Sequence, residues 1–356
     1  MVSQCEPSSS FPEIFNMTDC GFAGQTPAEH WRKIVAPYKG PDTRSSVRQL
    51  LSSAVPFVLL WTAMYWSLEV SYLLTLLLAI PTAGFVVRMF MIQHDCGHGS
   101  YFKSRWARDW TGFLIGVLTL TPYQYWRKTH AYHHSHSGNL DFRGFGDILT
   151  MTVKEYKALT PFGRLKYRLY RNPAVILGIG PAFHFLVKHR YPWDIPRDWK
   201  DAWTSVWRTN LFLAALVTGM SLWLGLGTFL MIQIPVTLLA CSMGVWLFYV
   251  QHQFEESYWH HKENWDYFDA ALQGSTHLVL PRPLQWMTAN IGLHHVHHLN
   301  SQIPNYKLEE CLNATPELQK VTKITFADSW RLFRLALWDE DNECMIGFGG
   351  LRKTAA

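Results

Sequence analysis

The chain has 356 residues, of which 48% are hydrophobic, 15% aromatic and 17% charged, and its formal net charge is +5. Soluble globular domains carry roughly 25% charged residues, and disordered chains combine high charge with few aromatic residues. The composition therefore excludes a disordered chain, and the small net charge argues against a nucleic-acid-binding protein. The length accommodates two soluble domains or, equally well, one membrane domain with additional cytosolic segments.

Two apolar segments follow a polar N-terminal region. Residues 1–49 are mixed and contain several prolines, so we expect a cytosolic segment with one or two short helices. Segment 50–68 contains no charged residue and is long enough to cross the ~30 Å hydrocarbon core as a helix. Segment 72–92, with Arg88 as its only charge, is a second candidate span. Because only residues 69–71 separate these two spans, they are predicted to form an antiparallel hairpin.

A second hairpin is predicted later in the chain. Segments 211–226 and 229–250 are both apolar, and glycines lie in the turn between them. Segments 113–121 and 174–187 are apolar but short, and runs of that length are more often re-entrant, interfacial or buried than spanning. The sequence therefore predicts four transmembrane helices in two hairpins.

The distribution of basic residues predicts the topology. Lysine and arginine number 17 in residues 93–210, 5 in residues 1–49 and 9 in residues 251–356. The two predicted hairpin tips, 69–71 and 225–229, have none. Because positive residues concentrate on the cytoplasmic side, we expect both termini and the central segment to be cytoplasmic.

One basic stretch has helical spacing. Its basic residues alternate with tyrosines and leucines, and they are Lys154, Lys157, Arg164, Lys166, Arg168 and Arg171. The pattern suits a helix that lies on anionic lipid headgroups. It suits an ordinary solvated helix face equally well, and the sequence leaves both interpretations open.

Histidines carry the chemistry. The chain has 17 of them, and three short clusters read HDCGH, HAYHH and HHVHH. Within the clusters, histidines recur at i and i+4 or at i, i+3 and i+4, which places them on one face of a helix. They are His94 and His98, then His130, His133 and His134, then His294, His297 and His298. Because eight imidazoles exceed what one metal can bind, two metal ions are predicted.

Two further histidines require a choice. His252 follows the fourth predicted span as His94 and His98 follow the second, so it is a candidate ninth ligand at the same depth. His295 is a rival of His294, which we favour because its spacing to the following histidines repeats that of HAYHH. Isolated histidines elsewhere are expected to be structural.

The kind of metal is constrained by what the sequence lacks. The motif H-E-x-x-H of zinc proteases is absent, and so is the Glu-x-x-His pair of soluble di-iron bundles. An all-nitrogen site for two metals favours iron used with oxygen over zinc used with water. All three clusters are predicted at one membrane face, whereas the ligands of a metal transport path are expected near the bilayer midplane.

With these motifs in place, the chain resembles the integral-membrane fatty acid desaturases and related hydroxylases, which share a three-histidine-box pattern. The stretches HDCGHGSYFKSRWARDW and QWMTANIGLHHVHHLNSQIPNY look most like bacterial acyl-lipid desaturases. The resemblance covers residues 50–310 and leaves 311–356 as a C-terminal cytosolic tail. It implies an all-α membrane protein whose four transmembrane helices are capped by a cytosolic helical domain holding a di-metal site.

The resemblance also implies the ligands. They are the eight clustered histidines, and His252 matches an additional ligand between the fourth span and the last cluster. Acyl-CoA desaturases of this superfamily place an asparagine one turn before that additional histidine, where this chain has Phe248. Asn290, one turn before His294, is a candidate for its supporting role.

The activity implied by the resemblance is O2-dependent introduction of a cis double bond into acyl chains of membrane lipids, with two non-haem iron ions as cofactor and O2 as co-substrate. A ligating histidine usually donates its other N–H to a carboxylate or carbonyl. The candidates for this supporting role near the clusters are Asp95, Asp141, Asp147, Glu255, Glu256 and Asn290.

Electrons must come from a separate protein, because no G-x-G-x-x-G fingerprint and no fused cytochrome b5 motif is visible. We expect a donor such as ferredoxin or cytochrome b5. Two alternatives stay open at this point. One is a fatty acyl hydroxylase or acetylenase on the same scaffold, and the other is a non-enzymatic metal-binding or transport protein.

Overall fold

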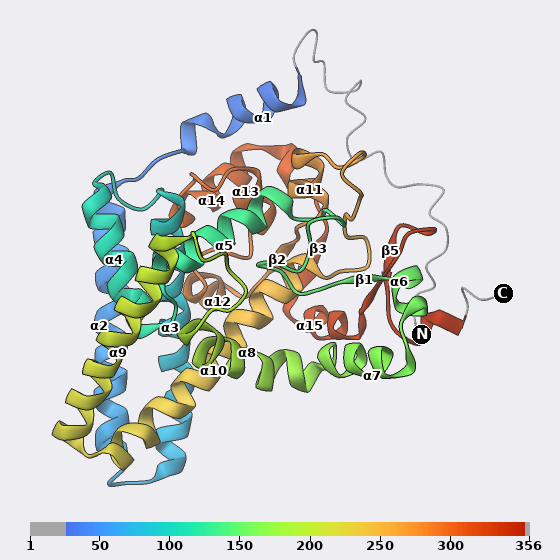
Figure 1. The fold of residues 1–356 in the computed structure, drawn as a ribbon. Coiled ribbons are helices and arrows are strands. Elements are labelled where there is room, and N and C mark those ends of the chain that lie inside the picture. The colour runs from blue at the N-terminus through green and yellow to red at the C-terminus, as the bar shows by residue number, and fades with distance from the viewer. Residues whose placement is uncertain (1–25, 353–356) are drawn as a thin grey trace.

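The computed structural model describes residues 26–352, so residues 1–25 of the predicted N-terminal segment lie outside the described residues. Helices dominate the fold (Figure 1). The α-helices are α1 (Pro27–Val35), α2 (Thr43–Ser67), α3 (Tyr72–His98), α4 (Arg105–Leu118), α5 (Tyr123–His136), α6 (Val153–Ala158), α7 (Pro161–Tyr170), α8 (Gly180–Leu186), α9 (Lys200–Leu224), α10 (Leu226–His252), α11 (Tyr267–Gln273), α12 (Arg282–Met287), α13 (His294–Leu299), α14 (Asn305–Ala314) and α15 (Phe326–Ser329). Short 3₁₀ turns are η1 (Ala36–Tyr38), η3 (Lys188–Arg190), η4 (Pro316–Lys320), η5 (Trp330–Arg334) and η6 (Gly350–Arg352), and η2 (Val175–Ile179) is a π-helical turn.

Four long helices form two hairpins, α2 with α3 and α9 with α10, which extend to one side of the molecule (Figure 1). Asp42 caps α2 by accepting from the Ser45 backbone N–H at 3.0 Å. Gly225 separates α9 from α10 with φ 83°, a conformation that glycine adopts at no steric cost. Helix α3 packs against both α2 and α10 and therefore joins the two hairpins.

Among the described residues, three helices are long and apolar enough to cross a membrane: α2, α3 and α10, with mean hydropathies of 1.3, 2.0 and 1.8. Helix α9 is not one of them, because its apolar stretch begins only after Arg208 and Asn210. The span expected at 211–226 therefore stays a prediction. These candidate spans expose large apolar side chains such as Leu59 and Leu77, which fits a surface that contacts lipid.

The expectation of an all-α fold needs correction, because short strands are present. Strands β1 (Met151–Thr152), β4 (Leu337–Asp339) and β5 (Cys344–Ile346) form one sheet in the order β1-β4-β5, with β1 parallel and β5 antiparallel to β4. Strands β2 (His277–Val279) and β3 (Lys323–Thr325) pair in parallel. Each strand has two or three residues, too few for a period-two pattern to stand out in the sequence.

The basic stretch forms two helices, α6 and α7, instead of one. Thr160 caps α7 by accepting from the Gly163 N–H at 3.2 Å, and Pro161 occupies the first helical position, which disfavours helix at the residue before it. Arg171 is not on either proposed face: it is buried and donates to Gln253 Oε1 at 2.8 Å and to the Leu335 carbonyl at 3.0 Å.

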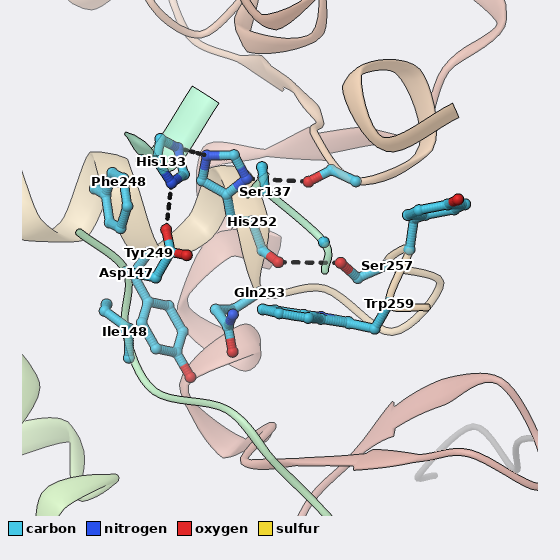
Figure 2. Close-up of a pocket in the computed structure, with 13 residues that line it drawn as sticks. His133, Ser137, Asp147, Ile148, Phe248, Tyr249, His252, Gln253, Ser257 and Trp259 are labelled. Atoms are coloured by element: carbon cyan, nitrogen blue, oxygen red, sulfur yellow. Dashed lines mark hydrogen bonds and ion pairs between the residues drawn. The ribbon is translucent and has the colours of Figure 1, made fainter. Parts of the chain in front are cut away.

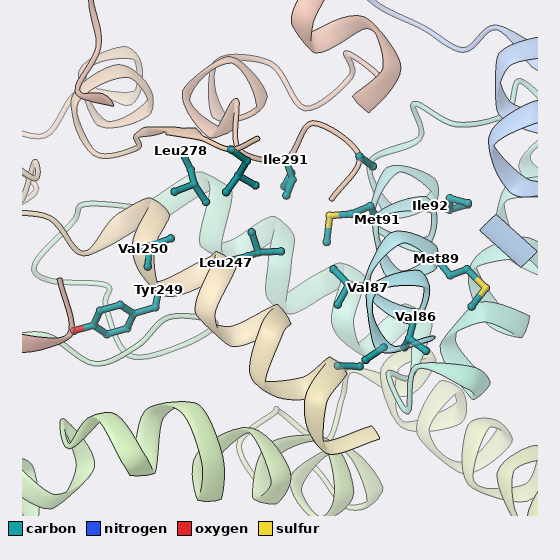
Figure 3. Close-up of a cluster of buried hydrophobic side chains, with 14 of the residues drawn as sticks. Val86, Val87, Met89, Met91, Ile92, Leu247, Tyr249, Val250, Leu278 and Ile291 are labelled. Atoms are coloured by element: carbon teal, nitrogen blue, oxygen red, sulfur yellow. The ribbon is translucent and has the colours of Figure 1, made fainter. Parts of the chain in front are cut away.

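The largest buried hydrophobic cluster joins α3 and α10 and includes residues near their C-terminal ends (Figure 3). Val87, Met91 and Ile92 of α3 share it with Leu247 and Val250 of α10. Residues from the C-terminal part of the chain belong to the same cluster, including Leu332, Phe333, Trp338 and Met345. Because interiors are close-packed, this cluster fixes the two helix ends relative to each other, and both ends carry histidines.

Candidate metal centre

The first histidine cluster lies on the last turns of α3. The helix ends at His98 because Gly99 adopts a left-handed conformation, φ 78°, and its N–H and that of Ser100 bond back to the carbonyls of Cys96 and Asp95. This is the glycine-terminated cap common at helix C-termini. Helix α3 is therefore longer than the span predicted at 72–92, and it carries His94 and His98 out of the apolar region on one rigid element.

The second and third histidine clusters lie on two shorter helices outside the two hairpins. Helix α5 carries His130, His133 and His134, and α13 carries His294, His297 and His298. The fourth contribution is His252, which is the last residue of α10. The i, i+3, i+4 spacing read from the sequence is thus a real helix face in α5 and α13.

The structure brings all nine predicted histidines together, in two groups. One group consists of His94, His98, His130, His134 and His297, and the other of His133, His252, His294 and His298. Within each group the potential ligand nitrogens lie within 4.8 Å of one another. Neither group contains a carboxylate, and each combines residues from three helices.

The spacing of the ring nitrogens fits a transition metal. His134 Nε2 lies 3.1 Å from His130 Nε2 and 3.0 Å from His297 Nε2. In the second group, His252 Nε2 lies 3.2 Å from His133 Nε2 and 2.9 Å from His294 Nε2. Two imidazoles bound to one ion at about 2.1 Å, at right angles, would have nitrogens about 3 Å apart.

Buried histidine nitrogens without a hydrogen-bond partner also indicate a metal site in each group. Within the described part of the chain, His98 Nε2 and His298 Nε2 are buried and have no hydrogen-bond partner. A buried polar atom without a partner costs free energy. One such atom lies in each group, where an ion would satisfy it.

Three ligand candidates donate their Nδ1–H to an oxygen outside the group. His94 donates to Asp95 Oδ1 at 3.0 Å, His133 to Asp147 Oδ1, and His252 to the Gly274 carbonyl at 3.0 Å. An oxygen acceptor on Nδ1 fixes the neutral tautomer with a free Nε2 lone pair. These contacts therefore orient each ring with its ligand atom toward the group.

Asp147 reaches His133 because of the loop before it (Figure 2). Gly146 has φ 78°, and a Cβ there would lie 2.8 Å from the Thr129 carbonyl of α5. Only glycine allows this close approach of loop and helix. The loop thereby sets the Asp147 carboxylate against the imidazole of His133, which in turn contacts His252 (Figure 2).

Asp95 is held by a residue that the sequence analysis missed. Its Oδ2 accepts from both the backbone N–H and the side-chain amide of Asn305, each at 2.7 Å. Asn305 also exchanges hydrogen bonds with Gln49 of α2. No local signal marks Asn305, because its partners lie more than 200 positions away in the chain.

Other predicted supporting residues lie elsewhere. Asp141 accepts from His261 Nδ1 at 2.7 Å and from the Lys262 N–H at 2.8 Å, in a partly exposed loop contact. Glu255 and Glu256 are exposed after the end of α10. Asn290 has φ 58° and bonds to the Asn305 carbonyl at 3.2 Å. The side chains of Asp141 and Asn290 thus bond to groups other than the clustered histidines, although both residues lie close to a cluster in the sequence.

The structure also shows where His295, the rival of His294, and Phe248 lie. His295 contacts the Leu318 carbonyl through Nε2 at 3.0 Å and points away from the groups that contain its neighbour His294. The ring of Phe248 packs 5.0 Å from that of His133 and 5.3 Å from that of His252. At the position of the asparagine expected by resemblance, this chain has an apolar wall.

Burial favours the neutral form of five clustered histidines. For five of them outside the spanning helices, burial lowers the pKa well below 6.5, and neighbouring histidines lower it further: His130, His134, His294, His297 and His298. Neutral imidazole is the form that binds metals. The surroundings thus favour ligation throughout the neutral pH range.

A cavity of about 920 Å³ borders both groups, at His94, His130 and His294. It extends between α3, α10 and the segment from α7 to α8. Most of its lining is apolar and includes Val87, Phe90, Ile176, Val236, Ala240 and Leu247. The arrangement can hold a long apolar molecule with one part of it beside the histidines.

Long apolar helices and two buried histidine groups define the class of this protein: a helical membrane protein built around a candidate two-metal centre. The fatty acid desaturase family model matches residues 70–327. A fatty acid desaturase of Bacillus subtilis (strain 168) is 46% identical over 320 residues, which are 90% of each chain. The chain therefore belongs to the fatty acid desaturase family, as the three histidine clusters predict, and is an oxidoreductase.

Two more distant relatives have more specific names. The sn-1 oleoyl-lipid 12-desaturase of Synechocystis sp. is 27% identical over 220 residues, 62% of each chain. The sn-1 acyl-lipid omega-3 desaturase (ferredoxin) of Synechocystis sp. is 26% identical over 260 residues, 70% of each chain. Family membership removes the purely metal-binding or transport interpretation.

Proposed function

We propose that this protein uses O2 to introduce a cis double bond into acyl chains of membrane lipids, at a centre of two iron ions. The observation that carries the proposal is the position of the two histidine groups at the wall of one long apolar cavity. The names of the acyl-lipid relatives support the lipid substrate.

The nine histidines are the proposed ligands, five for one ion and four for the other. When bound, the iron pair supplies the oxidising power that an unactivated C–H bond requires. The all-nitrogen donor set and the neutral, oriented rings support iron at this place.

The chain's own residues position the substrate and exclude water. The cavity's apolar lining holds an acyl chain in one register beside the histidines, and holding reactants in place contributes much of an enzyme's rate. Phe248, which lines this cavity and packs on His133 and His252, is the proposed barrier between the acyl chain and these two histidines. Asp95 and Asp147 keep their imidazoles in the ligating tautomer.

Membrane placement follows from the same helices. We place the cytosolic cap and its histidines at the cytoplasmic surface, with α7 and α8 in the interface. These two helices and η2 expose large apolar side chains, namely Phe162, Leu165, Leu169, Ile179 and Phe183. Since the cavity is bounded by the same segment, a lipid can present its acyl chain there without leaving the bilayer.

The electron donor is proposed to be a ferredoxin, in line with the printed name of the omega-3 relatives. Cytochrome b5 stays the alternative donor. Either would bind at the cytoplasmic face, where basic residues attract an acidic partner.

The test is the fatty-acid profile of a host that expresses the chain, with and without oxygen, by gas chromatography and mass spectrometry with double-bond location. We expect a new unsaturated species that requires oxygen and is missing with the variant His133→Ala. That variant should still insert into the membrane. A hydroxylated product would support the hydroxylase alternative, and activity retained in His133→Ala would contradict the ligand assignment.

A further inference from the structure

One face of α10 follows the cavity from the histidines into the apolar region. Gln233, Thr237, Cys241, Gly244 and Phe248 all line the cavity. They recur at intervals of three or four residues, so they form one stripe along the helix. The stripe ends one turn before His252, the ligand candidate at the end of α10.

Gly244 is the residue of this stripe that has no side chain. A Cβ at this position would meet no atom within 4 Å. At Gly112, by contrast, a Cβ would lie 2.4 Å from the Tyr123 ring, so close packing requires glycine there. Packing therefore does not require glycine at position 244, and its missing side chain leaves space that belongs to the cavity.

The direction of the stripe identifies the part of the substrate that passes it. The acyl chain of a membrane lipid extends from its headgroup at the surface toward the bilayer midplane. In the proposed placement, α10 also runs from His252 at the surface toward the midplane as residue numbers decrease. The methyl end of the acyl chain would therefore run along α10 from Phe248 past Gly244 toward Thr237. The polar end would stay near the interfacial segment that closes the cavity.

We infer that Gly244 sets the room for the methyl-terminal part of the acyl chain and thereby the longest chain that the enzyme accepts. The inference rests on the proposed function and deepens it. Gly244 precedes His252 by two turns, about 12 Å along the helix axis, or the length of roughly nine methylenes in an extended chain. Acyl chains whose segment beyond the new double bond is longer than this must pass Gly244.

The test compares Gly244→Leu with the wild type on membranes loaded with saturated acyl chains of graded length. We expect the ratio of long-chain to short-chain product to fall by about tenfold or more, because a filled site rejects added volume. Chains that end before position 244 should be desaturated at the wild-type rate. Gly244→Ala should give the same trend with a smaller effect.

Gly219→Leu is the matched control. Gly219 lies in α9, is exposed, and also has no atom within 4 Å of an added Cβ, but it does not line the cavity. Its variant should keep the wild-type profile. An unchanged length profile in Gly244→Leu, or an equal loss for all lengths in folded protein, would overturn the inference. Failure of the proposed function would differ, since the wild type itself would then form no unsaturated product.

Discussion

At the residue scale, two of the candidate supporting carboxylates, Asp147 and Asp141, have different partners and therefore lead to different predictions. Asp147 accepts from His133 Nδ1, whereas Asp141 accepts from His261 at the protein surface. Asp147→Asn removes the charge that fixes the His133 tautomer, and losing such a contact typically costs about 10–100-fold in metal affinity or activity. We expect a loss of that size in desaturation rate, together with less bound iron per protein.

Asp141→Asn is the control for this experiment. Its loop contact involves no clustered histidine, so bound iron and product formation should stay near wild-type values. Equal losses in the two variants would mean that Asp147 acts only by general stabilisation. The comparison also separates a supporting residue from one that was a candidate only because it is near a cluster in the sequence.

The same residues show what the sequence can and cannot predict. Eight of the nine histidines could be selected because i, i+3 and i+4 spacing is a local property of a helix, and His252 because it follows the fourth predicted span as His94 and His98 follow the second. Their binding of iron stays a prediction. Asp95 could be selected because it is next to His94. Asn305 and the Gly274 carbonyl could not, because one contact joins distant segments and the other involves a backbone atom that every residue has.

At the element scale, Arg88 connects the spanning helices to the segment before the last histidine cluster. It is buried in α3, donates to Ser53 Oγ of α2 at 3.1 Å and to the Trp286 carbonyl of α12, and its guanidinium lies 3.9 Å from the Trp286 ring centroid. Arg88→Met would remove both hydrogen bonds and the contact of the guanidinium with the Trp286 ring. We expect the free energy of unfolding to fall by about 1–3 kcal/mol, measured as a lower thermal midpoint in detergent.

Arg105→Met serves as its comparison, since Arg105 is exposed and pairs with Asp109 at 3.6 Å within one helix. Exposed pairs contribute little, so the midpoint should hardly move. An equally small change of the thermal midpoint in Arg88→Met would show that the contacts of Arg88 do not hold α3 against α12.

Element prediction succeeded where a segment is long and apolar and failed where pairing is non-local. The α2–α3 hairpin was readable from two charge-free runs with a short connection, and its exact ends depend on the caps at Asp42 and Gly99. Strands β1 and β4 pair across more than 180 positions. Each has only two or three residues, so neither segment allows its partner to be predicted from the sequence. The break between α6 and α7 was readable from Pro161, but the helical spacing of the basic residues concealed it.

At the scale of the whole molecule, the histidine groups constrain the topology. His252 at the end of α10 contacts His133 and His294, and His94 at the end of α3 lies in the neighbouring group. We therefore expect both helices to end at the same membrane face. On this expectation, the chain reaches that face after α3 and has to return to the far face before α10 begins.

Helix α9 is the element between these points that is long enough for the return, although its apolar stretch is shorter than those of the other three. We therefore expect four crossings, with both hairpin tips on the outer face. Single cysteines at Val70 and Gly227 should react with a membrane-impermeant thiol reagent in intact cells. A cysteine at Lys262, exposed near the end of α10, should react only after the cells are opened.

The wild type supplies the background for this labelling, and its thiols at Cys96, Cys241 and Cys311 are buried. Labelling at 70 but not at 227 in intact cells would mean that α9 does not cross. Helix α10 would then carry His252 to the face opposite His94, and the two histidine groups could not share one cavity. Labelling at 70 and 227, with protection at 262, is the pattern that keeps all nine histidines at the cytoplasmic face, within reach of a soluble electron donor.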